Sequence, residues 1–170
     1  MGFVKVYFFG FPYPGGPLID QFAAAGNPKK YTFTKPKVPN LDFSFSGLKT
    51  QILYFVQKNV LENYNFIEEN KADICASVQH TIIEILIDKL KLAVAETGIT
   101  QIAIGGGVSA NTGIRQTLKD AESKYGWKTF VPKFEYTTDN AAMIGIVGYQ
   151  KYQNQRFSDV KTTSKARIEF

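Results

Sequence analysis

One cysteine and one histidine stand among the 170 residues of this chain, and their scarcity excludes several kinds of chemistry. No disulfide can form within the chain, and a lone thiol is typical of a reducing compartment. We interpret Cys75 as a core residue, because it lies in an apolar helical pattern and no histidine is placed to activate it. His80 cannot form a metal site alone, and the H-E-x-x-H spacing of zinc proteases is absent, so we expect a packed or partly exposed helix residue.

Long hydrophobic runs are also missing, and no apolar stretch reaches the length of a membrane span. Residues 1–11 are apolar, but they lack the basic flank and the small-residue cleavage site of a secretory signal. We therefore expect a cytoplasmic protein that does not associate with a membrane. Its hydrophobic share of 44% and charged share of 21% are ordinary for a globular chain, and its length suffices for one core.

Acidic residues are in the minority, and much of the net charge of +5 lies in the last twenty residues, which hold five basic and two acidic side chains. A basic tail after a folded core can contact RNA phosphates. A solvated, half-ordered terminus is the simpler interpretation, and we favour it for residues 153–170.

The N-terminal part predicts short elements separated by turns. The run Pro12–Pro17 reads PYPGGP and fixes a turn, and Pro17 suits the first turn of a short helix that ends near Ala25. Residues Tyr31–Thr34 alternate in polarity as a short strand would.

Two longer helices follow in the sequence. The segment Asp42–Thr50 leads into a helix that continues through Val56. The longest signal predicts a helix over Ile67–Thr97, because apolar residues recur there every three or four positions and make one stripe. Gly98 is a natural position for its end.

The last third of the chain alternates between strands and helices. We predict a strand at Gln101–Ile104, a helix at Ser109–Tyr125, a strand at Thr129–Val131 and a helix at Asp139–Tyr152.

The predicted organisation is an α/β lobe over residues 1–150. A helical subdomain, at about 17–98, precedes a β-α-β-α unit at about 99–152, and the basic tail follows.

The most informative stretch is Ile102–Arg115, in which an apolar strand runs into three glycines and then into a helix. Such a junction brings backbone N–H groups and a helix N-terminus to the end of a strand, where anions and nucleotides bind. The lack of side chains at Gly105, Gly106 and Gly107 allows a ligand to approach closely.

Two polar residues follow these glycines. Ser109 can cap the helix, and Asn111 can direct its amide to a ribose or phosphate oxygen. A tight turn without a ligand is the alternative, because the glycine spacing is not that of the dinucleotide fingerprint.

A second strand-to-helix junction carries the acidic candidate. If Thr138 is the N-cap, Asp139 lies at the positive end of a helix, which favours its ionised state. Asp139 can then bind a metal cation or orient a catalytic water, and a helix-capping aspartate is the commoner alternative.

Lys49 is a further candidate, for a phosphate or RNA contact, in a segment where polar residues alternate with Phe43 and Phe45. A loop anchored by two aromatic rings is the simpler interpretation of that segment.

Five motifs occur in order along the chain: PYPGGP (Pro12–Pro17), DFSFSGLKT (Asp42–Thr50), ICASVQ (Ile74–Gln79), IAIGGGVSAN followed by IR (Ile102–Arg115), and FVPKFEYTTDNAAMIGIVGY (Phe130–Tyr149). Together they resemble the TsaD family of tRNA threonylcarbamoyladenosine transferases, long described as O-sialoglycoprotein endopeptidases or glycoproteases. The resemblance extends from about Gly10 to Tyr152.

The resemblance implies the actin, Hsp70 and sugar-kinase fold, in which two α/β lobes enclose a nucleotide cleft. It implies transfer of a threonylcarbamoyl group from its adenylate to the adenosine next to the anticodon of tRNA. By this resemblance, Asn111 binds the nucleotide-like substrate, Gly105, Gly106 and Gly107 line its adenosine side, and Asp139 ligates an active-site iron or zinc. It also implies tRNA, threonylcarbamoyl-adenylate, a TsaB-like paralogue and a TsaE-like ATPase as partners.

The chain departs from the family pattern in its N-terminal part. The H-x-x-x-H metal ligands and the glycine-rich phosphate loop of the N-terminal lobe are missing. We therefore expect a C-terminal half with an altered start, inactive alone and without a tightly bound metal. The alternatives are a non-catalytic module that binds tRNA or forms a homodimer, and a metal-dependent glycoprotease.

Overall fold

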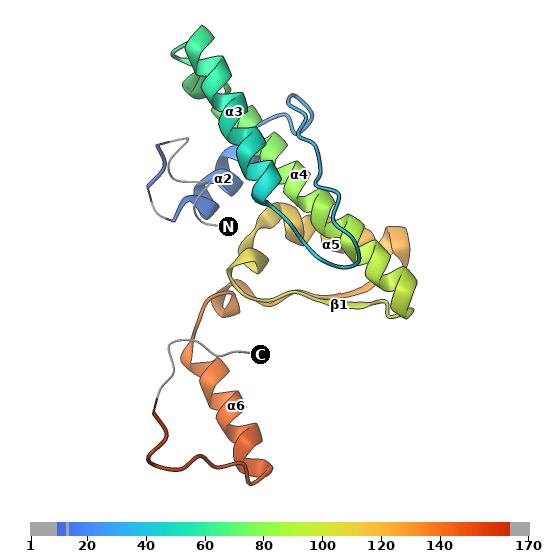
Figure 1. The fold of residues 1–170 in the computed structure, drawn as a ribbon. Coiled ribbons are helices and arrows are strands. Elements are labelled where there is room, and N and C mark those ends of the chain that lie inside the picture. The colour runs from blue at the N-terminus through green and yellow to red at the C-terminus, as the bar shows by residue number, and fades with distance from the viewer. Residues whose placement is uncertain (1–9, 13, 164–170) are drawn as a thin grey trace.

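A computed structural model describes residues 10–12 and 14–163 of the chain. The predicted apolar start at residues 1–9, residue 13 of the predicted turn and residues 164–170 of the predicted basic tail lie outside this part. The described elements, in order, are α2 (Gly15–Ala23), α3 (Ser46–Glu62), α4 (Phe66–Thr97), β1 (Gln101–Ala103), η1 (Gly107–Ala110), α5 (Thr112–Tyr125), β2 (Lys128–Phe130), η2 (Phe134–Tyr136) and α6 (Ala141–Gln153). The long helix α4 is central, because α2, α3 and α5 all pack on it (Figure 1).

The helix α4 confirms the prediction for Ile67–Thr97 to within one residue at its start. Two features of the sequence favour its ends. Glu68 and Glu69 lie in its first turn, where negative charge complements the helix dipole, and Gly98 ends it in the left-handed conformation with φ 69°.

Two groups of buried side chains hold the helices together. The first lies between α2, α3 and the first two thirds of α4, and it includes Ile19, Ile52 and Ile74. The second lies between the C-terminal part of α4, β1 and α5, and Leu118 is its most deeply buried member. Cys75 belongs to the first group with no exposed surface, which confirms it as a core residue, and burial raises the pKa of its thiol to about 11.

The predicted strand, helix and strand of the last third are confirmed. The strands β1 and β2 pair in parallel, with Ile102 opposite Thr129, and α5 connects them. The described structure is therefore α/β, mostly helical with a small parallel sheet.

The predicted strand at Tyr31–Thr34 is wrong, because side chains rather than a neighbouring strand bind its backbone. The Tyr31 N–H donates to the Ser77 hydroxyl at 3.2 Å. The Thr34 N–H donates to the Gln51 amide oxygen at 2.8 Å, and the Gln51 amide nitrogen donates to the Thr34 carbonyl at 3.1 Å. The segment belongs to the loop that joins α2 to α3, and its backbone contacts side chains of α4 and α3.

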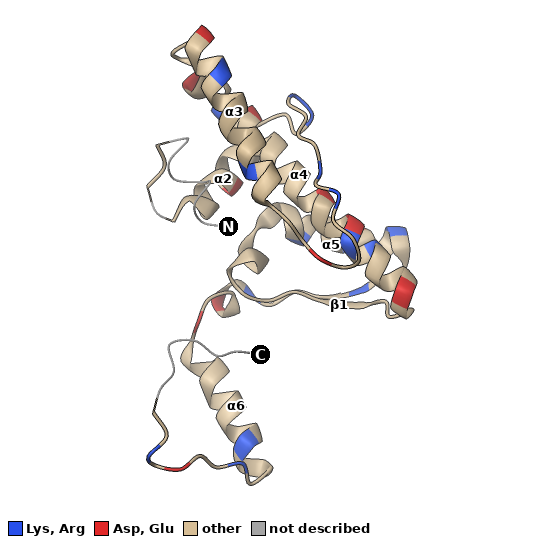
Figure 2. Cartoon of the chain, viewed as in Figure 1, with Lys and Arg blue, Asp and Glu red and all other residues tan. Residues whose placement is uncertain are grey.

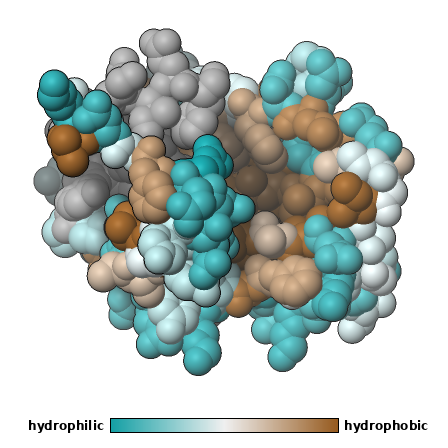
Figure 3. Space-filling view, turned by 90° about the horizontal axis from the view of Figure 1, so that it is seen from below, coloured by the Kyte–Doolittle hydropathy of each residue, from teal (hydrophilic) through white to brown (hydrophobic). Residues whose placement is uncertain are grey.

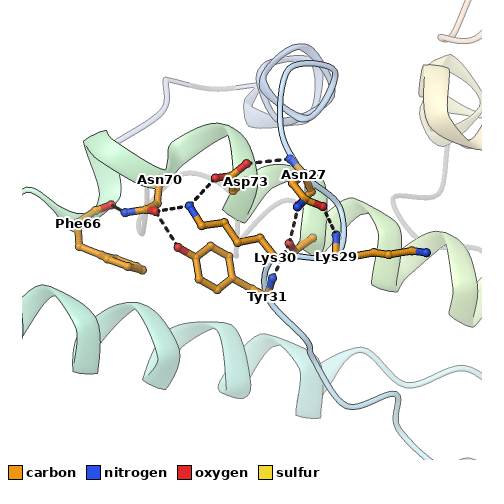
Figure 4. A network of polar contacts seen from close by, with 8 residues as sticks. Asn27, Lys29, Lys30, Tyr31, Phe66, Asn70 and Asp73 are labelled. Atoms are coloured by element: carbon orange, nitrogen blue, oxygen red, sulfur yellow. Dashed lines mark hydrogen bonds and ion pairs between the residues drawn. The ribbon is translucent and has the colours of Figure 1, made fainter.

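The loop that follows α2 is fastened to α4 by a polar network (Figure 4). The Asn27 N–H donates to an Asp73 carboxylate oxygen at 2.8 Å, and the Lys30 ammonium lies 2.7 Å from the other oxygen. Lys30 and the Tyr31 hydroxyl both donate to the Asn70 amide oxygen. The Asn27 and Lys30 contacts lower the pKa of Asp73.

The helix α6 stands apart from the other helices (Figure 1), and none of its residues is buried. It carries few charged residues (Figure 2). No helix in the described part of the chain has the length and apolar character needed to cross a membrane.

Candidate functional site

A cavity of about 930 Å³ lies where α2, α3, α4 and the start of α5 meet. Its walls are mainly apolar, with Leu48 and Ile52 from α3 and Val78 and Ile82 from α4. The face of the molecule in Figure 3 is hollowed, and apolar residues gather in the hollow. This volume is in the range of pockets that hold small organic ligands.

Polar groups from three helices converge at one end of this pocket. Asp20 of α2 accepts hydrogen bonds from the Thr112 N–H at 2.9 Å, the Thr112 hydroxyl at 2.9 Å and the Asn111 amide nitrogen at 3.0 Å. The same amide nitrogen donates to the Gln79 side-chain oxygen of α4 at 2.8 Å. The four residues make a polar end in a largely apolar pocket.

Asp20 and Gln79 were not among the predicted site residues. A signal for Asp20 was present in the sequence, because it is the only charged residue in the helix Gly15–Ala23. A single charge in an apolar helix is expected to have a polar partner elsewhere in the fold.

The glycine junction, Gly105–Gly107 between β1 and α5, has the tight backbone that its sequence predicts. Gly106 has φ 71° and ψ −178°, a conformation that is essentially restricted to glycine. Gly107 lines the pocket together with Asn111, whereas Gly105 borders a smaller apolar cavity of about 220 Å³ between α4 and α5. Gly106 is among the described lining residues of neither cavity.

The prediction that Ser109 caps the following helix is wrong. The short helix η1 intervenes, so α5 begins only at Thr112, and Asn111 is its N-cap. The Asn111 side-chain oxygen accepts from the Ile114 N–H at 2.9 Å. Ser109 is buried instead, and its hydroxyl donates to the Gly106 carbonyl at 2.7 Å.

Arg115 connects the two strand-to-helix junctions. Its Nε donates to the Ser109 carbonyl and its Nη2 to the Pro132 carbonyl, both at 2.6 Å. The guanidinium carbon lies 4.2 Å from the centre of the Phe134 ring, which also lines the pocket. Arg115 therefore holds the segment after β2 against the glycine junction.

The predicted start of the last helix is also wrong. Asn140, not Thr138, is the N-cap of α6, and its side-chain oxygen accepts from the Met143 N–H at 3.1 Å. Asp139 precedes the cap and is exposed. In residues 10–12 and 14–163, no three His, Cys, Asp or Glu side chains are grouped so that they could hold a metal ion. Asp139 therefore has no complete set of metal ligands around it in this part of the chain.

His80 is a partly exposed residue of α4, as expected. Its side chain is 40% exposed, and its Nε2 lies 3.7 Å from a Glu84 carboxylate oxygen.

A glycine-rich strand-to-helix junction beside a large pocket with a polar end is typical of α/β proteins that bind nucleotides. Comparisons with known proteins show the family of the chain. The family model of TsaD, tRNA N6-adenosine threonylcarbamoyltransferase, matches residues 4–146, and the chain belongs to this family.

Relatives with the name tRNA N6-adenosine threonylcarbamoyltransferase share extensive identity with the chain. The protein from Christiangramia forsetii is 66% identical over 161 residues, and that from Riemerella anatipestifer is 52% identical over 161 residues. Each alignment covers 95% of this chain but 47% of the relative. The protein from Thermotoga neapolitana is 41% identical over 144 residues, which cover 84% of this chain and 42% of the relative. The chain thus spans about half the length of these relatives, and it matches their C-terminal half.

Proposed function

We propose that this chain forms the C-terminal half of a tRNA threonylcarbamoyl transferase and supplies the wall of its active site that binds a nucleoside. The observation that carries the proposal is the polar end of the pocket, where Asp20, Gln79 and Asn111 converge beside the glycine junction. Carboxylate and amide groups can bind ribose hydroxyls, and apolar walls can enclose a purine ring.

The proposed reaction of the complete enzyme moves a threonylcarbamoyl group from its adenylate to the N6 amine of an adenosine in tRNA. The amine nitrogen bonds to the carbamoyl carbon, the bond from that carbon to the phosphate oxygen breaks, and AMP leaves as the amine gives up a proton. In this proposal, Asp20 and Asn111 hold the adenylate in place, so that the transferred group is directed out of the pocket. The family membership supports tRNA, a TsaB-like paralogue and a TsaE-like ATPase as partners in the cytoplasm.

The proposed metal, iron or zinc, needs ligands beyond the described residues of this chain. Asp139 would contribute one carboxylate, and the described residues do not complete a ligand set around it. We therefore assign no step of the reaction to the metal.

The surface of α6 supports the view that the chain is one half of a larger fold. Six large apolar residues of this helix are 40% to 77% exposed: Met143, Ile144, Ile146, Val147, Tyr149 and Tyr152. A helix that is hydrophobic on all sides is normally buried in a complete protein. We infer that α6 packs on the other half of the enzyme, in a two-lobed fold of the actin and Hsp70 kind. This chain would be the C-terminal lobe, with the helical subdomain and the β-α-β-α unit that the sequence predicts.

Calorimetric titration of the chain with adenosine tests the proposed nucleoside wall. We expect saturable binding, and we expect Asp20→Ala to weaken it about tenfold, because the polar end loses its carboxylate. Asp42→Ala is the control, since Asp42 is an exposed acidic residue outside the described lining of the pocket. A wild-type chain that is folded by circular dichroism and binds no adenosine would show that this proposal is wrong.

A further inference from the structure

The large pocket has two charged side chains among its described lining residues, and they differ in their partners. These are Asp20 and Lys49. The Asp20 carboxylate accepts hydrogen bonds from Asn111 and Thr112. The Lys49 ammonium has no ion pair or hydrogen bond with another described residue. Lys49 is therefore the one cation among the described lining residues that the fold leaves available.

Lys49 belongs to a helix that contributes no residue to the polar end. Lys49 lies in the first turn of α3, next to Leu48 and one helical turn before Ile52, which also line the pocket. The polar end comes from α2, α4 and the start of α5 instead. A ligand whose ribose is held at the polar end could extend a charged group toward α3.

We propose that Lys49 is a specificity-determining residue, which makes the pocket prefer a nucleoside 5′-monophosphate to the uncharged nucleoside. The inference rests on the proposed function, because it takes a nucleoside as the ligand of the polar end. An ammonium group binds a phosphate through charge-assisted hydrogen bonds, and the stem of the lysine can lie along the apolar wall. One available cation suits one phosphate group better than a triphosphate.

Paired titrations of the chain with adenosine and with AMP test this role. For the wild type we expect AMP to bind about tenfold more tightly than adenosine, as for a partly exposed charge-assisted contact. Lys49→Met should bring the affinity for AMP down to that for adenosine and leave the adenosine affinity unchanged. Lys49→Arg should retain most of the preference. Lys58→Met is the matched control, since Lys58 is an exposed lysine of the same helix that is outside the described lining of the pocket.

The outcomes separate this inference from the proposed function. If adenosine binds and AMP binds equally well, or if the preference survives in Lys49→Met, the role of Lys49 is wrong while the nucleoside wall stands. If neither compound binds the folded chain, the nucleoside wall itself is wrong, and the role of Lys49 falls with it. The preference should also shrink in 1 M salt, because dissolved ions weaken a charge contact that is open to solvent. A salt-independent preference would contradict a charge contact.

Discussion

Replacement of Gly26 by alanine tests the close packing of the loop after α2 against the backbone of α4. A Cβ atom at this position would lie 2.1 Å from the Ala72 carbonyl oxygen and 2.8 Å from the Asp73 backbone nitrogen. Both atoms belong to the backbone of α4, which cannot move aside as a flexible side chain can. The loop must therefore lift from the helix.

The cost of Gly26→Ala can be estimated from the contacts that this movement disturbs. Overpacking against a rigid neighbour costs about 3 kcal/mol at the upper end of its usual range. Lifting the loop also weakens the hydrogen bond from the Asn27 N–H to Asp73, which adds about 1 kcal/mol. Alanine also restricts the unfolded chain, which offsets this cost by less than about 1 kcal/mol. We expect a net loss of about 3 kcal/mol in the free energy of unfolding.

Urea denaturation followed by circular dichroism measures this loss, and thermal unfolding should show a fall in Tm of roughly 10 °C. Gly47→Ala is the matched control, because Gly47 lies in the first turn of α3 and a Cβ there meets no atom within 4 Å. The control should be neutral or gain up to about 1 kcal/mol from helix propensity. A Gly26→Ala variant as stable as the wild type would refute the close packing of this loop on α4.

Three further predictions concern other parts of the fold. Gly106→Ala should cost about 2 kcal/mol in urea denaturation, because φ 71° with ψ −178° is strained for any other residue, and an unchanged stability would contradict this backbone. Burial raises the pKa of Cys75 to about 11, so the free energy of unfolding should fall as the pH rises from the ordinary thiol range toward 11. Urea denaturation at pH 8 and at pH 10 measures this loss, and equal stability at the two pH values would show that the thiol is exposed. Arg115→Met should speed amide hydrogen exchange at Tyr136 and Thr137, whose N–H groups are hydrogen-bonded in η2, and leave the exchange of Leu118 in α5 unchanged. Equal exchange in the wild type and the variant would show that Arg115 does not hold the segment after β2.

Much of the helical architecture could be predicted from the sequence, because it follows from local patterns. The stripe of apolar residues and Gly98 define α4 almost completely, and Cys75 lies in its buried stripe. The parallel pair β1 and β2 could be predicted as well, since two short apolar segments flank an amphipathic helix. These features depend on residues that are close together in the sequence.

Other features could not be predicted, because they depend on contacts between distant residues. The segment Tyr31–Thr34 has a strand-like alternation, but Ser77 and Gln51 bind its backbone in the fold. Asp20 lies 91 residues before Asn111 in the sequence, and only packing of α2 and α5 on α4 brings the two together. The polar end of the pocket is thus a product of tertiary structure.

We propose that this chain supplies the nucleoside-binding half of a tRNA-modifying transferase. A direct test is a chimera in which this chain replaces the matched half of the Christiangramia forsetii relative, to which the chain is 66% identical. Mass spectrometry of tRNA treated with threonylcarbamoyl-adenylate should detect threonylcarbamoyladenosine with the chimera, far less with its Asp20→Ala variant, and none with the 170-residue chain alone. A folded but inactive chimera beside an active parent, or modification of tRNA by the chain alone, would contradict the claim.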